Sequence, residues 1–138
     1  MVRLGRGVAL TVAVGLFSAV AVAGGNSPRI NYMLHCQGCH LPGGIGHPGI
    51  VPSMRGQVGL FLRSEEGRAY LVQVPGVAQS NLDNQQLAEV LNWMLPEFDP
   101  AHVDADFKRY TADEIARYRG THLASVSATR RALLAGED

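Results

Sequence analysis

The sequence has only two cysteines, no excess of charge of either sign and no convincing strand pattern. Its 12 Lys and Arg residues balance 12 Asp and Glu residues, so the composition gives no reason to expect nucleic-acid binding. The carboxylates are scattered over faces predicted to be solvent-exposed, and no nucleophile–base pair stands out. No internal repeat or low-complexity segment is present. These absences leave the two thiols and their neighbours as the residues from which a function can be argued.

Both cysteines belong to one short segment, Cys36-Gln37-Gly38-Cys39-His40. Two thiols separated by two residues and followed directly by a histidine are typical of an attachment site for c-type haem. Cys36 and His40 are four residues apart and therefore lie on the same side of a helical turn. We expect Cys36 and Cys39 to form thioether bonds to the porphyrin and His40 to bind the iron as its proximal ligand.

Three other functions are compatible with parts of this segment. A thioredoxin-like redox site normally lies beside a strand–helix–strand pattern, which the sequence does not show. A structural zinc site needs four ligands, and only His47 lies near enough to add one, in a strained geometry. A disulfide between Cys36 and Cys39 would close only a very small loop. Haem attachment is therefore the interpretation that the segment favours.

The first 23 residues have the pattern of a secretory signal peptide. Arg3 and Arg6 form a positive start, residues 8–22 are largely apolar, and residues 21–23 supply small side chains for cleavage after Ala23. An uncleaved membrane anchor would need a somewhat longer apolar run. Because c-type haem is attached outside the reducing cytoplasm, the leader and the haem motif together predict a periplasmic protein.

Removal of the leader leaves enough chain for one domain. The leader carries two of the basic residues and none of the acidic ones, so the mature chain is weakly acidic. Such a mixed-sign surface is compatible with transient docking to a protein partner through local charge patches.

A short first helix is expected to lead into the haem motif. It begins at Ser27-Pro28, a hydroxyl N-cap followed by proline at the first helical position. The segment 41–52 after the motif is rich in Gly and Pro, and its glycines would let the backbone pass close to a flat ligand. We expect the carbonyl of Pro52, or failing that Pro48, to accept a hydrogen bond from Nδ1 of His40 and so to fix its tautomer. Simple stiffening of the loop is the alternative role for both prolines.

The segment 57–73 is also predicted to be helical. Gly67 interrupts the pattern, so two shorter helical pieces are an alternative. Four charged residues are assigned to the solvent-exposed side of this segment, namely Arg63, Glu65, Glu66 and Arg68.

A closing helix is predicted to begin at Asp83, which forms a capping-box pattern with Gln86. The helix carries an apolar stripe, and Pro96 is expected to end it. Two more helices are predicted beyond an acidic connector. The first covers 111–119 and starts with a second capping box; the second covers 125–134 and has a weaker pattern.

These features resemble the class I monohaem c-type cytochromes. The match comprises the haem motif after a short helix, the segment Pro52-x-Met54-x-Gly56 in the place of the family's Pro-x-Leu-x-Gly, a middle helix, and a closing helix with an aromatic residue, here Trp93. It covers about residues 27–96. The resemblance implies a small all-α, cytochrome c-like fold in which the first and last helices cross and one covalent haem c lies in a cleft. It also implies transfer of single electrons between periplasmic redox partners.

The chain is accordingly divided into a signal peptide at 1–23, a cytochrome c-like haem domain at 24–96 and a C-terminal helical extension at 97–138. The extension is expected either to pack on the haem domain or to dock on a larger enzyme. Four aromatic residues give it the apolar mass for either role, namely Phe98, Phe107, Tyr110 and Tyr118.

The resemblance leaves the second iron ligand open. The family usually supplies a methionine from the loop before the closing helix, but here the loop 74–82 contains neither Met nor His. Met54 is our candidate for the sixth ligand, although it could instead replace the family's packing leucine. The sixth position could also be open, or be filled by a histidine of the extension (His102 or His122) or by Met94. The position of Met94 in the apolar stripe assigns it to the core.

Two functions follow from this interpretation. The first is an electron carrier, or the cytochrome subunit of a periplasmic dehydrogenase, rather than an enzyme in its own right. Its partners would be a dehydrogenase donor and an oxidase or cytochrome acceptor. The second is a haem protein with an open or labile sixth position that binds a small ligand, as a sensor or in peroxide or gas chemistry. Neither function involves nucleic acid or a permanent membrane anchor.

Overall fold

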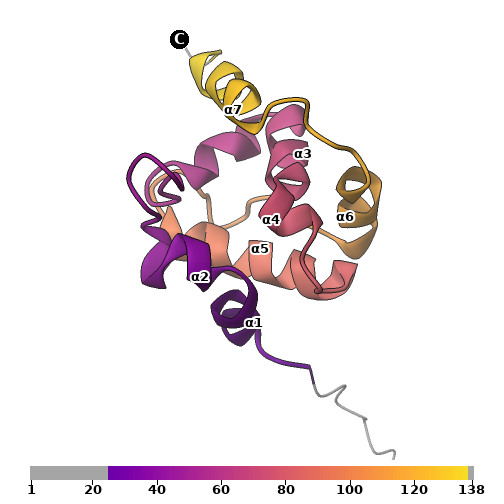
Figure 1. The fold of residues 1–138 in the computed structure, drawn as a ribbon. Coiled ribbons are helices and arrows are strands. Elements are labelled where there is room, and N and C mark those ends of the chain that lie inside the picture. The colour runs from indigo at the N-terminus through magenta and orange to yellow at the C-terminus, as the bar shows by residue number, and fades with distance from the viewer. Residues whose placement is uncertain (1–24, 137–138) are drawn as a thin grey trace, which may run out of the picture.

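The computed structural model describes residues 25–136, and the leader predicted at 1–23 lies outside this range. The described residues form helices and no strand, apart from one isolated bridge between His47 and Val51. This confirms the predicted all-α fold (Figure 1). The helices are α1 (Pro28–His35), α2 (Gln37–His40), η1 (Pro42–Gly44), η2 (Val58–Arg63), α3 (Glu65–Gln73), α4 (Pro75–Ala78), α5 (Asn84–Phe98), α6 (Ala112–Arg119) and α7 (Val126–Ala135), where η marks a 3-10 helix.

The helix starts follow the capping chemistry that the sequence predicts. The Ser27 hydroxyl accepts a hydrogen bond from the backbone of Ile30, and Pro28 occupies the first position of α1. Asp83 and Gln86 form the reciprocal bonds of a capping box at the start of α5. A cap supplies acceptors to the free backbone N–H groups of the first turn, and substitution of a cap by alanine typically costs about 0.5–2 kcal/mol.

The segment 57–73 forms two shorter helical pieces, η2 and α3, which confirms the predicted alternative, but the break lies at Ser64, so the predicted interruption at Gly67 was wrong. Ser64 is extended, and its hydroxyl accepts a hydrogen bond of 2.9 Å from the backbone of Gly67. Gly67 lies inside α3 because a Cβ atom at this position would lie 2.2 Å from the carbonyl oxygen of Phe61. The glycine is therefore needed for the close approach of η2 and α3.

The closing helix α5 continues past Pro96 to Phe98, so the predicted stop at Pro96 was also wrong. Proline lacks an N–H and removes one helical hydrogen bond, yet the backbone of Asp99 still donates to the carbonyl of Leu95 at 3.0 Å. Packing of Phe98 holds this last turn. Its ring lies 5.1 Å from the ring of Tyr32 and 5.6 Å from that of Trp93.

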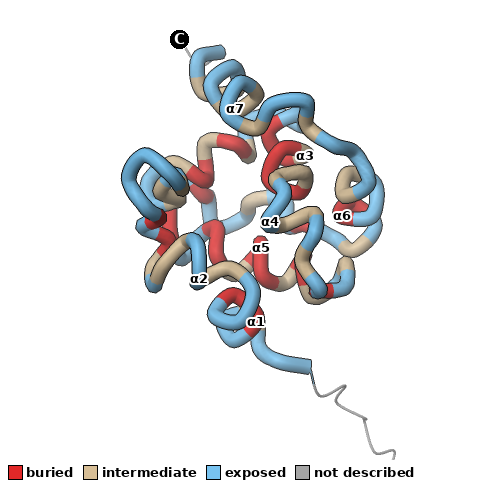
Figure 2. The backbone as a smooth tube through the Cα atoms, viewed as in Figure 1, coloured by how far each residue is buried: buried red, intermediate tan, exposed pale blue. Residues whose placement is uncertain are grey.

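The core lies around α5, which packs against α1 on one side and α6 on another. Figure 2 shows the buried residues along α5 and on the inward sides of α1, α3 and α6. Leu95, Ile115 and Val72 are fully buried. Met94 is buried as well, which is the core position that the apolar stripe predicts. No helix among the described residues has the length and apolar character needed to cross a bilayer.

The segment after α5 packs on α3 and α5 and buries a charged pair. Arg68, which we expected to face solvent, is 6 % exposed. Its guanidinium donates two hydrogen bonds, of 2.8 and 2.9 Å, to the carboxylate of Glu114 and a third to the carbonyl of Lys108. Because Glu114 binds Arg68, the predicted capping box of α6 is only half formed, with Thr111 accepting from the backbone of Glu114.

Replacing Arg68 with alanine should destabilise the protein by about 3–5 kcal/mol, because Glu114 would remain as a buried charge without its partner. Arg117→Ala is the matched control, since Arg117 lies 4.0 Å from Glu65 in an exposed pair. Such pairs contribute less than about 1 kcal/mol. Urea unfolding of both variants measures the difference, and equal losses of free energy would contradict the assigned role of Arg68.

Candidate functional site

The cysteine–histidine segment forms a tight helical corner between α1 and α2. Cys36 ends α1 and starts α2, and the backbone of His40 donates to the carbonyl of Cys36 at 3.0 Å. Cys36 and His40 are thus one helical turn apart, as the spacing predicts. Both Cys36 and Cys39 are free thiols in this structure.

A strained turn follows His40 and directs the chain away from α2. Leu41 has a φ of 60°, in the left-handed region that side chains other than those of Gly, Asn and Asp rarely adopt. The phenol of Tyr32 donates a hydrogen bond of 2.8 Å to the carbonyl of Leu41. Burial raises the pKa of Tyr32 to about 12, with the Cys36 thiol as a second cause, so the phenol remains a donor. Tyr32 thereby ties α1 to the turn that orients His40.

The imidazole of His40 has a buried ring nitrogen without a partner. Its Nδ1 atom forms no hydrogen bond with the described residues. Burial also lowers the pKa of His40, which favours the neutral ring. Neutral imidazole is the form that binds metals. Since buried polar atoms are nearly always bonded, this exception marks His40 as a residue with a role other than packing.

The expected hydrogen bond from His40 to Pro52 or Pro48 is not formed. The carbonyl of Pro52 lies against Gly46, where it would be 2.8 Å from a Cβ atom. Gly46 has a positive φ and donates its N–H to the carbonyl of His40 at 2.9 Å. The loop is therefore bonded to the backbone of His40 through Gly46. The Pro52 carbonyl packs against Gly46 and does not accept a hydrogen bond from the imidazole of His40.

The glycines of this loop serve packing between protein segments. A Cβ atom at Gly44 would lie 2.8 Å from the ring of Phe98, and one at Gly46 would lie 2.4 Å from the carbonyl oxygen of Val51. We had expected these glycines to admit a flat ligand. The contacts show instead that they bring the loop against α5 and against its own backbone.

The chemistry of the two thiols argues against a thioredoxin-like site. Burial raises the pKa of Cys36 to about 11, and the neighbouring Cys39 adds to the shift. The attacking cysteine of a thiol–disulfide enzyme has a lowered pKa, so Cys36 has the opposite environment. The described residues also contain no group of three or more His, Cys, Asp or Glu side chains that could hold a metal ion. Two free thiols beside an imidazole match the donor set of a c-type haem.

Met54 packs at the base of the loop. Its backbone N–H donates to the carbonyl of Gly44 at 2.8 Å. Its terminal methyl group lies 3.2 Å from the position of a Cβ atom at Gly44, close to the ring of Phe98. The contacts of Met54 are those of a packing residue, and iron ligation by its sulfur remains a prediction. Of the two candidate histidines in the extension, His102 bonds through Nδ1 to the carboxylate of Asp99 at 2.8 Å, and His122 is exposed.

Sequence reasoning missed Arg119, which holds the loop between α4 and α5. Its guanidinium donates to the carbonyls of Ala78 and Leu82 at 2.9 and 2.7 Å, to the carbonyl of Ser80, and to Asn84 at 3.1 Å. No local pattern identifies this arginine, because its acceptors lie about 40 positions earlier in the chain. Arg119 therefore fixes the loop 74–82, which contains neither methionine nor histidine.

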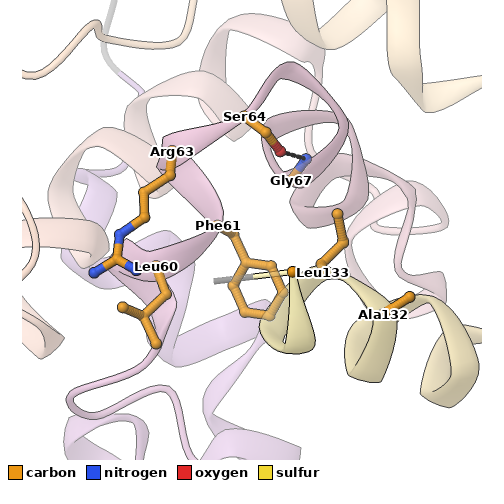
Figure 3. Close-up of a pocket in the computed structure, with 8 residues that line it drawn as sticks. Leu60, Phe61, Arg63, Ser64, Gly67, Ala132 and Leu133 are labelled. Atoms are coloured by element: carbon orange, nitrogen blue, oxygen red, sulfur yellow. Dashed lines mark hydrogen bonds between the residues drawn. The ribbon is translucent and has the colours of Figure 1, made fainter. Parts of the chain in front are cut away.

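A separate hollow of about 630 Å³ lies where α7 meets η2 and α3 (Figure 3). Phe61 and Leu133 line it from the two sides, and the bond between Ser64 and Gly67 borders it. None of the residues of the cysteine–histidine segment lines this hollow. It is therefore distinct from the candidate site.

A small all-α protein with a Cys-x-x-Cys-His corner at the end of its first helix has the fold and site of a c-type cytochrome. Two similar curated proteins, both cytochrome c-552 of Thermus thermophilus, agree with this class. One is 30% identical over 126 residues, which cover 78% of this chain and 84% of the relative. The other is 32% identical over 106 residues, which cover 64% of this chain and 81% of the relative.

No family description and no solved structure matches the chain significantly. The match to the two relatives is nevertheless extensive enough to assign a family. The chain belongs to the class I monohaem c-type cytochromes. As a member of this family it is an electron carrier that uses haem c.

Proposed function

We propose that the chain is a periplasmic cytochrome that carries single electrons through one haem, bound covalently by Cys36 and Cys39 and ligated by His40. The observation on which the proposal rests is the helical corner, which places Cys36 one turn from the half-buried imidazole of His40, whose pKa is lowered by burial. When bound, the haem supplies one-electron cycling between ferric and ferrous iron. Its donor would be a periplasmic dehydrogenase, and its acceptor an oxidase or another cytochrome.

The protein residues orient the ligand and limit its motion. Tyr32 holds the turn after His40 through the carbonyl of Leu41, and Gly46 holds the carbonyl of His40 itself. The backbone that carries the imidazole is thus restrained at His40 and at the residue that follows it. A rigid ligand lowers the structural change that accompanies each change of iron charge, which suits electron transfer rather than substrate turnover.

Mass spectrometry of the exported protein tests this assignment. We expect a chain that begins after Ala23 and carries the mass of one haem that survives denaturation. The leader pattern at 1–23 supports export, and covalent attachment supports a periplasmic location. An exported chain with both thiols unmodified would contradict the proposal.

A second candidate function is binding of a small ligand at an open sixth position of the iron. Two observations favour it. The loop 74–82 contains no methionine or histidine and is held by Arg119, and Met54 packs on Gly44 and Phe98. A five-coordinate haem iron binds carbon monoxide readily in the ferrous state.

The variant Met54→Leu distinguishes iron ligation by Met54 from an open sixth position. From the packing of Met54 we expect this volume-conserving change to cost less than about 1.5 kcal/mol of stability and to leave the visible spectrum of the ferric protein unchanged. The ferrous wild-type protein should then bind carbon monoxide as rapidly as the variant. If the spectrum changes and only the variant binds carbon monoxide, Met54 is the sixth ligand and the open-site function is excluded.

A further inference from the structure

The last helix, α7, lies on the surface of the protein and packs through few side chains. None of its residues is buried. Val126, Leu133 and Leu134 are partly buried and pack against the core. Phe61 and Leu133 lie on opposite sides of the hollow of about 630 Å³ (Figure 3). Because this hollow interrupts the apolar contact, apolar packing alone holds α7 weakly, and polar contacts must contribute to its position.

Arg130 connects α7 to a segment 73 positions earlier in the chain. Its guanidinium donates a hydrogen bond to the side-chain carbonyl of Gln57 and lies 5.9 Å from the centre of the Phe61 ring. The side-chain hydrogen bonds of Ser125 and Thr129, by contrast, remain within α7 and its cap. A guanidinium that donates to an amide and also stacks on an aromatic ring is fixed at two points.

Gln57 belongs to a turn that starts at Met54. The backbone N–H groups of Gln57 and Val58 both donate to the carbonyl of Met54, at 3.3 and 3.0 Å. The segment 54–58 is therefore closed on itself through its backbone and bonded to Arg130 through the side chain of Gln57.

The same turn is bonded to the loop that follows His40. The backbone N–H of Met54 donates to the carbonyl of Gly44 at 2.8 Å, and that of Gly44 donates to the carbonyl of Leu41 at 3.2 Å. Leu41 follows His40 directly. A continuous series of hydrogen bonds therefore leads from Arg130 in α7 to the residue after His40. Such contiguous networks carry energetic coupling between distant parts of a protein.

We propose that Arg130 is a positioning residue for the haem site, which acts through Gln57 and holds the segment 54–58 against the loop that follows His40. The inference rests on the proposed function, because the segment can tune only a haem that the chain carries.

The expected effect of this positioning is on the balance between ferrous and ferric iron. Apolar packing around a haem limits the access of water, and water favours the more highly charged ferric state. Met54 packs at the base of the loop that follows His40, so it contributes to this packing when its segment is held in place. Loss of the bond from Arg130 should therefore admit water and favour the ferric state.

Substitution of Arg130 with alanine tests the proposal in the haem-loaded protein. The amides of Met54 and Val58 should exchange their hydrogens about tenfold faster than in wild type, as measured by NMR, because the segment opens more often. In a redox buffer of fixed potential, the ratio of ferrous to ferric protein, read from the visible spectrum, should fall about threefold. Arg131→Ala is the matched control. Because this neighbouring arginine is exposed, its substitution should leave both values as in wild type.

Two further variants separate positioning by Arg130 from a general loss of stability. Thr111→Ala removes the cap of α6 and should lower the urea midpoint without changing the redox ratio. The double variant Arg130→Ala/Gln57→Ala should change the ratio no more than Arg130→Ala does alone, because both substitutions break the same hydrogen bond.

The outcomes distinguish this inference from the proposed function. A wild-type protein without covalent haem would contradict the proposed function, and the inference with it. If wild type carries haem, an Arg130→Ala variant whose redox ratio is unchanged or raised would overturn the role of Arg130 alone. Additive effects of the two substitutions in the double variant would also overturn it. So would an equal fall of the ratio in Thr111→Ala, since loss of stability would then account for both results.

Discussion

Replacing both Cys36 and Cys39 with serine is expected to abolish covalent haem attachment. The two thiols are the only cysteines of the chain, so no other residue can form a thioether bond with the porphyrin. The purified double variant should lose its visible absorption after extraction with acidified organic solvent, and its mass should be that of the polypeptide alone. This is the largest expected effect on function, because electron transfer depends entirely on the haem.

The two single variants are the controls for this experiment. Cys36→Ser and Cys39→Ser each leave one thiol, so each should retain some haem that resists extraction. The amount of haem that resists extraction should differ between the two single variants, because Cys36 is half-buried within the helical corner and Cys39 is exposed. Haem that resists extraction in the double variant would contradict attachment through these residues.

Ending the chain after Pro100 is expected to leave no stably folded protein at 25 °C. The truncation removes Val103, Tyr110 and Ile115, which are all buried, and each such side chain contributes about 1.5–3 kcal/mol. It also removes Glu114 and leaves the guanidinium of Arg68 buried without its partner, at a cost of about 3–5 kcal/mol. Together these losses are comparable with the whole stability of a small domain, about 5–15 kcal/mol.

A shorter truncation serves as the control. Ending the chain after Ala124 removes α7, which has no buried residue, and this variant should remain folded with a lower urea midpoint. Circular dichroism and urea unfolding measure both truncations. If the chain that ends at Pro100 unfolds at the same urea concentration as the full chain, the extension does not stabilise the haem domain, and a docking role on another protein becomes the better account.

The sequence predicted the helix starts well because capping is a local interaction. Ser27, Asp83, Thr111 and Ser125 each accept a bond from a backbone N–H three residues later. The haem motif is similarly local, since the bond between His40 and Cys36 spans a single turn. Such features depend on residues that are adjacent in sequence and therefore need no knowledge of the rest of the chain.

The errors arose where distant segments determine the conformation or the burial of a residue. Pro96 is normally a helix terminator, but packing of Phe98 on Tyr32 keeps the last turn helical. The local pattern assigns Arg68 to the surface, but its partner Glu114 lies 46 positions later. The role of Gly67 follows from its contact with the backbone of Phe61. None of these contacts has a signature in the sequence.

The sequence by itself determined the all-α fold, the helix caps and the cysteine–histidine corner. Only the tertiary structure decided that the extension packs on α3 and α5 and that Arg119 holds the loop before α5. The physical reason is the range of the interactions. Caps and helical turns join residues within four positions of one another, whereas burial and the bonds of buried arginines depend on which distant segments the fold brings together.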